Sequence, residues 1–253
     1  MTTRALVMGG GGVLGIAWMV GLAASWKEAN VDLARADLVV GTSAGSVVGT
    51  LIRYGVDPAQ LTALVTAGMG LPPAAVAKVA TGAGLSEDEW VGLFQAPLGD
   101  APWPPRPLRI SAVDVETGEP VMWTRESGVP IARALASSCA VPNLLPKVLI
   151  NGRRYLDGGA RSGTHADQAA GYDRVLIVAP MGVPKYALGH EMLEKERAAL
   201  EAGGSRVMVV LPDAATLQVF GDNLMDPARI FEALTAGRRQ GSELAGPVRA
   251  FWG

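Results

Sequence analysis

A serine that could act as a nucleophile lies in the pentapeptide Gly41-Thr42-Ser43-Ala44-Gly45, between a predicted strand and a predicted helix. In this setting a G-x-S-x-G motif places the serine hydroxyl at the edge of a sheet, near the positive end of the following helix. The flanking glycines Gly41 and Gly45 let the backbone turn sharply. An ordinary turn in which Thr42 or Ser43 caps the helix explains the same residues equally well.

A run of glycines at residues 9–12 follows the first predicted strand. Because they carry no side chains, Gly10, Gly11 and Gly12 could direct backbone N–H groups at an acyl oxygen, as an oxyanion hole does. The same loop fits a dinucleotide-binding fingerprint through Gly10, Gly12 and Gly15. That fingerprint also needs an acidic residue at the end of the second strand, which here ends in glycine, threonine and serine. We therefore favour the oxyanion hole and keep nucleotide binding as the alternative.

A serine nucleophile needs a base, and the chain contains only two histidines, His165 and His190. Both are expected at helix starts, where a solvated or capping role is commoner than catalysis. Asp157 is better placed, because it follows a short strand and precedes Gly158 and Gly159, which let other backbone come close. An Asp-Gly-Gly segment is normally only a turn. A carboxyl with the usual pKa of ~3.9 is also a weak base unless it is held close and partly desolvated.

These three elements occur in the order found in the patatin-like phospholipase family. The chain resembles that family through GGGGVLG at 9–15, GTSAG at 41–45 and DGG at 157–159, and the stretches SAVDVETGEPVMW and ALASSCAVPNLLPKVLINGRRYLDGG are similar to its bacterial branch. The resemblance implies a Ser-Asp dyad without histidine, in which Ser43 attacks an ester carbonyl and Asp157 takes its proton. It implies the glycine loop as the source of oxyanion donors, a lipid or other acyl ester as substrate, and no metal or organic cofactor.

The chain departs from the family pattern at two places. Family members commonly carry an arginine before the last glycine of the first motif, where this chain has Leu14. An Asn-Pro pair often follows Asp-Gly-Gly, whereas residues 162–165 read Ser-Gly-Thr-His here. Both changes leave the dyad intact and bear on substrate preference. Two alternatives stay open within this fold: a Ser-His hydrolase that uses His165, and a catalytically silent interaction module.

The order of strands and helices predicts one α/β domain over 1–253, with three layers and a mostly parallel central sheet covered by helices on both faces. The resemblance implies a patatin-like fold, related to but distinct from the α/β-hydrolase fold. Residues 108–125 and 147–159 predict hairpins. Apolar runs at 174–180 and 206–212 predict parallel strands buried on both faces.

A helical insert is expected at about 57–105, where the sequence is rich in alanine, glycine and proline and no strand is predicted. Its apolar side chains could form a lid that shapes an acyl-chain pocket, or could be ordinary core. These side chains are Leu61, Leu64, Val65, Met69, Leu71, Val76, Leu85, Trp90, Leu93 and Phe94.

Composition limits the partners. The net charge is −2 and the 22 basic residues are scattered, which argues against a nucleic-acid partner. The 17 arginines against 5 lysines indicate a GC-rich bacterial genome.

The uncharged run from Ala5 to Trp26 is broken by glycines, so we expect no transmembrane segment but a soluble, cytoplasmic protein with at most peripheral membrane contact. The single Cys139 lies in an apolar run and predicts a buried structural thiol. No pattern indicates the oligomeric state.

Overall fold

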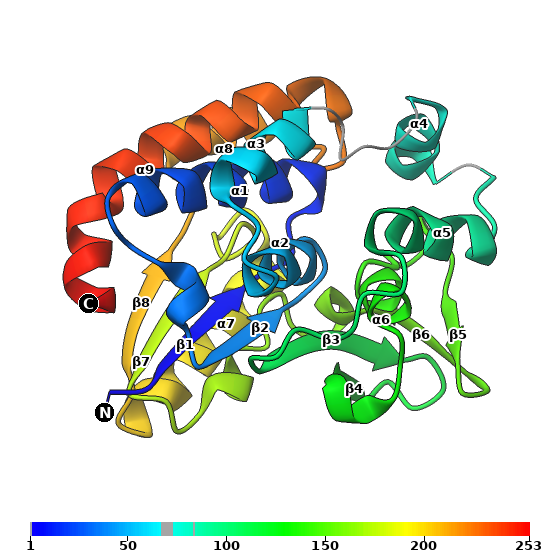
Figure 1. The fold of residues 1–253 in the computed structure, drawn as a ribbon, viewed down its shortest axis with the longest axis horizontal. Coiled ribbons are helices and arrows are strands. Elements are labelled where there is room, and N and C mark those ends of the chain that lie inside the picture. The colour runs from blue at the N-terminus through cyan, green and yellow to red at the C-terminus, as the bar shows by residue number, and fades with distance from the viewer. Residues whose placement is uncertain (1, 67–72, 83) are drawn as a thin grey trace.

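One mixed sheet of eight strands forms the centre of the part described by the computed structural model, residues 2–66, 73–82 and 84–253 (Figure 1). The strands are β1 (Arg4–Met8), β2 (Leu38–Gly41), β3 (Leu108–Asp114), β4 (Pro120–Trp123), β5 (Val148–Ile150), β6 (Arg153–Asp157), β7 (Arg174–Val178) and β8 (Arg206–Val210). Their order is β5-β6-β3-β2-β1-β7-β8, with β4 also paired to β3. The strands β3, β2, β1, β7 and β8 are parallel, whereas β4, β6 and β5 join through antiparallel pairs.

Helices cover both faces of this sheet, as the sequence predicts. They are α1 (Gly12–Glu28), α2 (Ala44–Arg53), α3 (Pro58–Thr66), α4 (Pro73–Thr81), α5 (Glu87–Leu98), α6 (Ile131–Ser138), α7 (Ala187–Ala202), α8 (Ala214–Phe220) and α9 (Ile230–Trp252). The alternation of side chains along β1 separates two cores. Leu6 and Met8 belong to the larger core with α1, α2 and α9, while Ala5 and Val7 pack with α7 on the opposite face.

The uncharged N-terminal run is explained by the burial of α1. The helix lies between the sheet and α9 (Figure 1), and nearly every residue from Leu14 to Trp26 is buried. Glycines bring the two helices unusually close, because a Cβ at Gly21 would lie 2.4 Å from a carbonyl oxygen of α9 and one at Gly237 would lie 2.2 Å from the carbonyl oxygen of Trp18. Among the described residues, no helix has the length and apolar character needed to cross a membrane.

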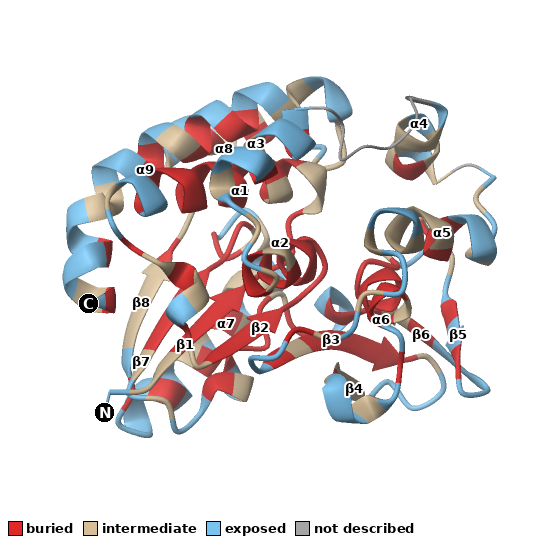
Figure 2. Ribbon diagram, in the orientation of Figure 1, coloured by how far each residue is buried: buried red, intermediate tan, exposed pale blue. Residues whose placement is uncertain are grey.

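The strand predictions agree with the structure except at one edge. Both predicted hairpins are present, as β3-β4 and β5-β6. Complete burial of the 206–212 run is wrong, because only Val210 of β8 is buried. Since β8 is the last strand of the sheet, its outer side has no neighbouring strand, and Figure 2 shows it paler than the buried β1 and β2.

The segment between β2 and β3 is helical, as expected, and supplies α3, α4 and α5. The start of α5 is fixed by a capping box: Ser86 Oγ accepts from the N–H of Glu89, and the Glu89 carboxylate accepts from the N–H of Ser86. Helix α5 lies beside α6 (Figure 1). Residues 67–72, with the predicted pocket residues Met69 and Leu71, are outside the described part.

Candidate active site

Ser43 occupies a strained turn between β2 and α2. Its backbone has φ 50° and ψ −121°, a conformation that non-glycine residues rarely adopt, and it is the N-cap residue of α2. The Ser43 side chain makes no capping hydrogen bond, and Thr42 Oγ1 instead contacts Ser111 and His165. The capping interpretation of this motif is therefore wrong. Ser43 is 8% exposed and lines an apolar cavity.

The two motif glycines are required by contact with other backbone. A Cβ at Gly41 would lie 2.4 Å from the Cα of Ser46, and a Cβ at Gly45 would lie 2.0 Å from the carbonyl oxygen of Met8 in β1. Neither neighbour is the flexible end of a side chain. The start of α2 is thus packed directly against the carboxyl end of β1, which fixes the position of Ser43 relative to the glycine loop.

We expect Gly45→Ala to lower the free energy of unfolding by about 3 kcal/mol, because the new methyl group overlaps rigid backbone. Gly92→Ala in α5 is the matched control, since its new Cβ meets no atom within 4 Å among the described residues outside its own stretch of helix. Alanine should raise stability there by up to about 1 kcal/mol. Urea unfolding of both variants measures the difference, and equal stabilities would contradict the packing of α2 on β1.

Asp157 reaches the same level of the sheet from the opposite direction. It ends β6, which runs antiparallel to β3, and it pairs with Ala112. Ile110 of β3 pairs on its other side with Gly41 of β2. Ala112 lies two residues after Ile110 in β3, and Ser43 lies two residues after Gly41 in β2. Because Ala112 pairs with Asp157, the register places Asp157 and Ser43 at the same level on either side of β3.

Burial dominates the electrostatics of Asp157, which is 5% exposed. Loss of hydration raises the pKa of its carboxyl to about 6, and hydrogen bonds from the Ser43 side chain and the Gly159 N–H oppose this only in part. The Gly159 N–H donates to Asp157 Oδ1 at 2.7 Å. Gly158 is required for another reason, because a Cβ there would lie 2.8 Å from the Ser111 Cβ and 3.0 Å from the Ser111 carbonyl oxygen. The structure thus brings Asp157 and Ser43 together, with the carboxyl held by its own turn.

The glycine loop also lies beside Ser43. A Cβ at Gly10 would be 3.5 Å from the Ser43 Cβ. The Gly10 N–H is already occupied, since it donates to the carbonyl oxygen of Gly163 at 2.9 Å. The N–H groups of Gly11 and Gly12 have no acceptor among the described residues. Of the three expected oxyanion donors, only these two are free in this conformation.

The predicted histidine alternative is not supported by contacts. His165 is 1% exposed, so a solvated role is wrong, and burial lowers the pKa of its imidazole to about 4. Its Nδ1 lies 3.2 Å from Thr42 Oγ1 rather than at Ser43. His190 Nδ1 lies 2.8 Å from the carbonyl oxygen of Gly182. Neither imidazole is bonded to the Ser43 hydroxyl.

A buried carboxylate supports the loop that departs from the family pattern. Glu196 of α7, 5% exposed, accepts hydrogen bonds from the hydroxyls of Ser162 and Thr164, both at 2.6 Å, and from the N–H of Ala166 at 2.8 Å. This loop carries the Gly163 carbonyl that holds the glycine loop. Sequence reasoning missed Glu196, because nothing distinguishes it from the other charged residues of α7. It also missed Ser138, whose Oγ accepts the Ser43 N–H at 3.0 Å.

An apolar cavity of about 520 Å³ opens at Ser43. Of the predicted insert residues in the described part, Val76 and Leu85 do not line it. Those that do are Leu61, Leu64, Val65, Trp90, Leu93 and Phe94. Cys139 also lines the cavity and is 9% exposed, which confirms the predicted burial of the thiol, and burial raises the pKa of that thiol. The volume is within the range of about 300–1,000 Å³ of small-molecule sites.

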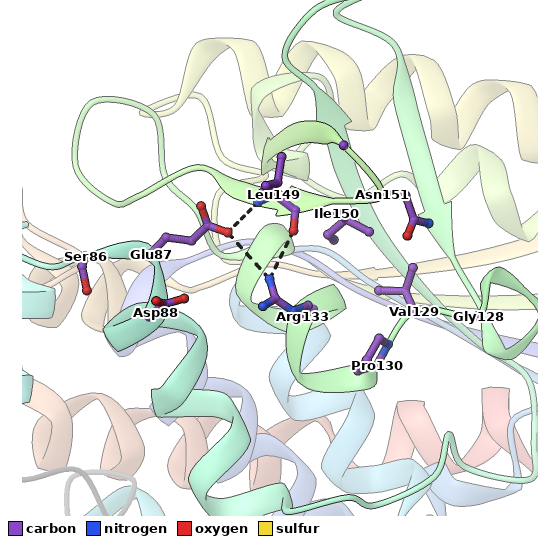
Figure 3. Close-up of a pocket in the computed structure, with 11 residues that line it drawn as sticks. Ser86, Glu87, Asp88, Gly128, Val129, Pro130, Arg133, Leu149, Ile150 and Asn151 are labelled. Atoms are coloured by element: carbon purple, nitrogen blue, oxygen red, sulfur yellow. Dashed lines mark hydrogen bonds and ion pairs between the residues drawn. The ribbon is translucent and has the colours of Figure 1, made fainter.

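A second cavity of about 610 Å³ lies between the starts of α5 and α6 and strand β5 (Figure 3). Two of its three charged residues, Arg133 and Glu87, are occupied with each other and with backbone. Arg133 donates to the Leu149 carbonyl at 3.2 Å and lies 3.7 Å from the Glu87 carboxylate, which accepts the Leu149 N–H at 2.8 Å. Neither Ser43 nor Asp157 lines it, so we assign it no part in the chemistry.

The fold, with its glycine loop and G-x-S-x-G turn at one edge of a mixed sheet, is patatin-like. The model of the family described as patatin-like phospholipase matches residues 6–69 and 80–170, more than half of the chain. The chain therefore belongs to the patatin-like phospholipase family.

Two solved structures are similar. VipD from Legionella pneumophila is 12% identical, with a TM-score of 0.52 over 97% of this chain and 67% of that chain, a likeness of fold alone. The type III effector protein ExoU is 15% identical, with a TM-score of 0.46 over 97% of this chain and 53% of that chain. The search of curated proteins gave no match.

Proposed function

We propose that the chain is a serine acyl-ester hydrolase acting on lipids or related esters, with Ser43 as nucleophile and Asp157 as its base. The observation that carries the proposal is the position of Ser43, which lines an apolar cavity and lies close enough to the buried Asp157 carboxyl to lower its pKa. Membership of the patatin-like phospholipase family supports the same class of reaction.

The mechanism has two acyl-transfer steps. Asp157 accepts the hydroxyl proton of Ser43 as Oγ attacks the ester carbonyl carbon, and the resulting oxyanion is stabilised by the N–H groups of Gly11 and Gly12. The C–O bond to the alcohol then breaks, the alcohol leaves with the proton from Asp157, and an acyl-enzyme ester remains on Ser43. Water attacks that ester with Asp157 again as base, which releases the carboxylic acid and restores the serine.

The raised pKa of Asp157 suits this role. A carboxyl with a pKa of about 6 is still largely ionised at neutral pH, yet it binds a proton more tightly than an ordinary aspartate. Burial is the cause, so the same water exclusion that makes the carboxyl a better base also strengthens its electrostatic interaction with the Ser43 hydroxyl.

The cavity supports an acyl chain as the part of the substrate that is bound. No charged side chain is among its lining residues in the described part, and each methylene group removed from water contributes about 0.8 kcal/mol. Leu64 of α3 both lines the cavity and is 41% exposed. We extend the proposal to peripheral membrane contact, in which the exposed Leu64 of α3 touches the lipid that supplies the substrate.

No observation favours the nucleotide-binding alternative. A Cβ at Gly11 would lie 2.6 Å from Pro180 and one at Gly12 would lie 2.6 Å from the carbonyl oxygen of Leu224, so packing within the protein already accounts for both glycines without a nucleotide. Strand β2 also ends at Gly41 and not at an acidic residue. A catalytically silent module is distinguished by the test below.

A panel of p-nitrophenyl esters with graded acyl chains, measured beside defined phospholipids, tests the proposed function. We expect kcat/KM to rise with chain length, about threefold to fourfold for each added methylene while the chain still enters the cavity, and then to level off. The phospholipids show whether a charged head group is accepted. Absence of hydrolysis across the whole panel, with a folded protein, would favour the silent module.

A further inference from the structure

Among the described residues, one buried hydroxyl on a residue that lines the apolar cavity has no hydrogen-bond partner. Thr50 of α2 lines the cavity and is 1% exposed, and its Oγ1 has no hydrogen-bond partner within the described part of the chain. A threonine hydroxyl in a helix commonly bonds the carbonyl one turn back, which would satisfy it without a ligand. Leaving a buried hydroxyl unpaired destabilises the fold, and a hydrogen bond to a ligand would remove that cost.

The other polar side chains that line the cavity are already occupied. The Tyr54 hydroxyl and the Trp90 Nε1–H each donate to a backbone carbonyl, at 2.8 Å and 2.9 Å. The Cys139 thiol lies 3.9 Å from the Ser46 hydroxyl. Apart from the proposed nucleophile, the Thr50 hydroxyl is therefore the polar side-chain group that remains for a ligand among the described lining residues.

Thr50 and Ser43 lie on the same side of α2. Seven residues are nearly two helical turns, and the cavity is lined along this side by Ser43, Val47, Thr50 and Tyr54. At about 1.5 Å rise per residue, the two hydroxyls are separated by roughly 10 Å along the helix. An acyl chain that is attached at Ser43 and lies in the cavity along α2 would pass Thr50.

We propose that Thr50 selects acyl chains that carry a hydroxyl or oxo group in mid-chain, an inference that rests on the proposed function. An extended chain advances about 1.25 Å per carbon, given bonds of about 1.5 Å and angles of about 111°. The recognised group would therefore lie about eight carbons beyond the carbonyl. It would be uncharged, because no opposite charge lines the described cavity to compensate an ion.

Hydrolysis of three p-nitrophenyl esters tests this: dodecanoate, 9-hydroxydodecanoate and 3-hydroxydodecanoate. We expect the wild type to prefer the 9-hydroxy ester over the 3-hydroxy ester. In Thr50→Val, which keeps the side-chain shape, the kcat/KM ratio of the 9-hydroxy ester to dodecanoate should fall about fivefold, the effect of one hydrogen bond. Thr50→Ser retains the hydroxyl and should keep most of this preference. An equal ratio in wild type and Thr50→Val would overturn the proposal.

A binding measurement separates this inference from the proposed function. In the Ser43→Ala background, isothermal titration calorimetry with the free acids should show 9-hydroxydodecanoate losing about fivefold in affinity relative to dodecanoate when Thr50→Val is added. If the wild type hydrolyses no ester but this difference persists, the proposed function fails and the selectivity of Thr50 stands. If the added substitution leaves relative affinity unchanged, the selectivity fails even where esters are hydrolysed.

Discussion

Replacing Ser43 with alanine is expected to lower kcat/KM for ester hydrolysis by at least about 10³-fold and to abolish covalent labelling by a fluorophosphonate. The substitution removes only Oγ, the atom that would form the acyl-enzyme. The protein should remain folded, because the Ser43 side chain caps no helix and the strained backbone is the same for serine and alanine. Activity and labelling by the probe are measured on the same preparation, beside a circular dichroism spectrum.

Ser205→Ala is the matched control for this experiment. Ser205 is also 8% exposed, but its hydroxyl donates to the Tyr172 carbonyl at the start of β8. We expect that variant to be labelled and active like the wild type. Full turnover in Ser43→Ala would show that another group forms the covalent intermediate, and the proposed mechanism would be wrong.

Asp157→Asn is expected to lower kcat/KM by about 10²-fold to 10⁴-fold, the usual contribution of a general base. In the wild type, kcat/KM should fall about tenfold per pH unit below about pH 6, because the base must be ionised and burial raises its pKa to that value. An aspartate with an ordinary pKa would keep its activity down to about pH 4. A pH profile of kcat/KM measures this limb, and a profile that is flat between pH 5 and pH 7 would contradict the assignment.

The same substitution should stabilise the protein at pH 8. A carboxyl whose pKa is higher in the folded state opposes folding when it is ionised, so wild-type stability should decrease as pH rises from about 4 to about 6. Asp157→Asn removes that cost, and we expect its free energy of unfolding to exceed that of the wild type by about 1–3 kcal/mol at pH 8. Exposed Asp167→Asn is the control and should change neither activity nor stability.

His165→Ala distinguishes the histidine alternative. In the Ser-Asp arrangement this variant keeps Asp157 and loses the contact with Thr42 together with the packing of a buried imidazole. A loss of activity in His165→Ala together with near-normal activity in Asp157→Asn would therefore favour a Ser-His hydrolase. The reverse pattern is expected from the buried, neutral state of His165.

The sequence by itself determined the elements and the reactive segments. Nearly continuous apolar runs indicated the parallel strands, alternating residues around tight turns indicated the hairpins, and a long segment without a strand pattern indicated the helical insert. The glycines of the G-x-S-x-G motif indicated a sharp turn, and backbone contacts as short as 2.0 Å show why glycine is needed there. The order of the three motifs along the chain indicated the patatin-like phospholipase family. The match of that family's model to residues 6–69 and 80–170 confirms it.

Only the tertiary structure decided which groups meet. The antiparallel pairing of β6 with β3 brings Asp157 close to Ser43. Loss of hydration in that position raises the pKa of the Asp157 carboxyl. The pairing of Gly10 with Gly163 leaves just Gly11 and Gly12 as donors, and no local pattern encodes a hydrogen bond between segments some 150 residues apart. The physical reason is general: local sequence fixes backbone periodicity, whereas distance, burial and hydrogen-bond partners depend on how distant segments pack.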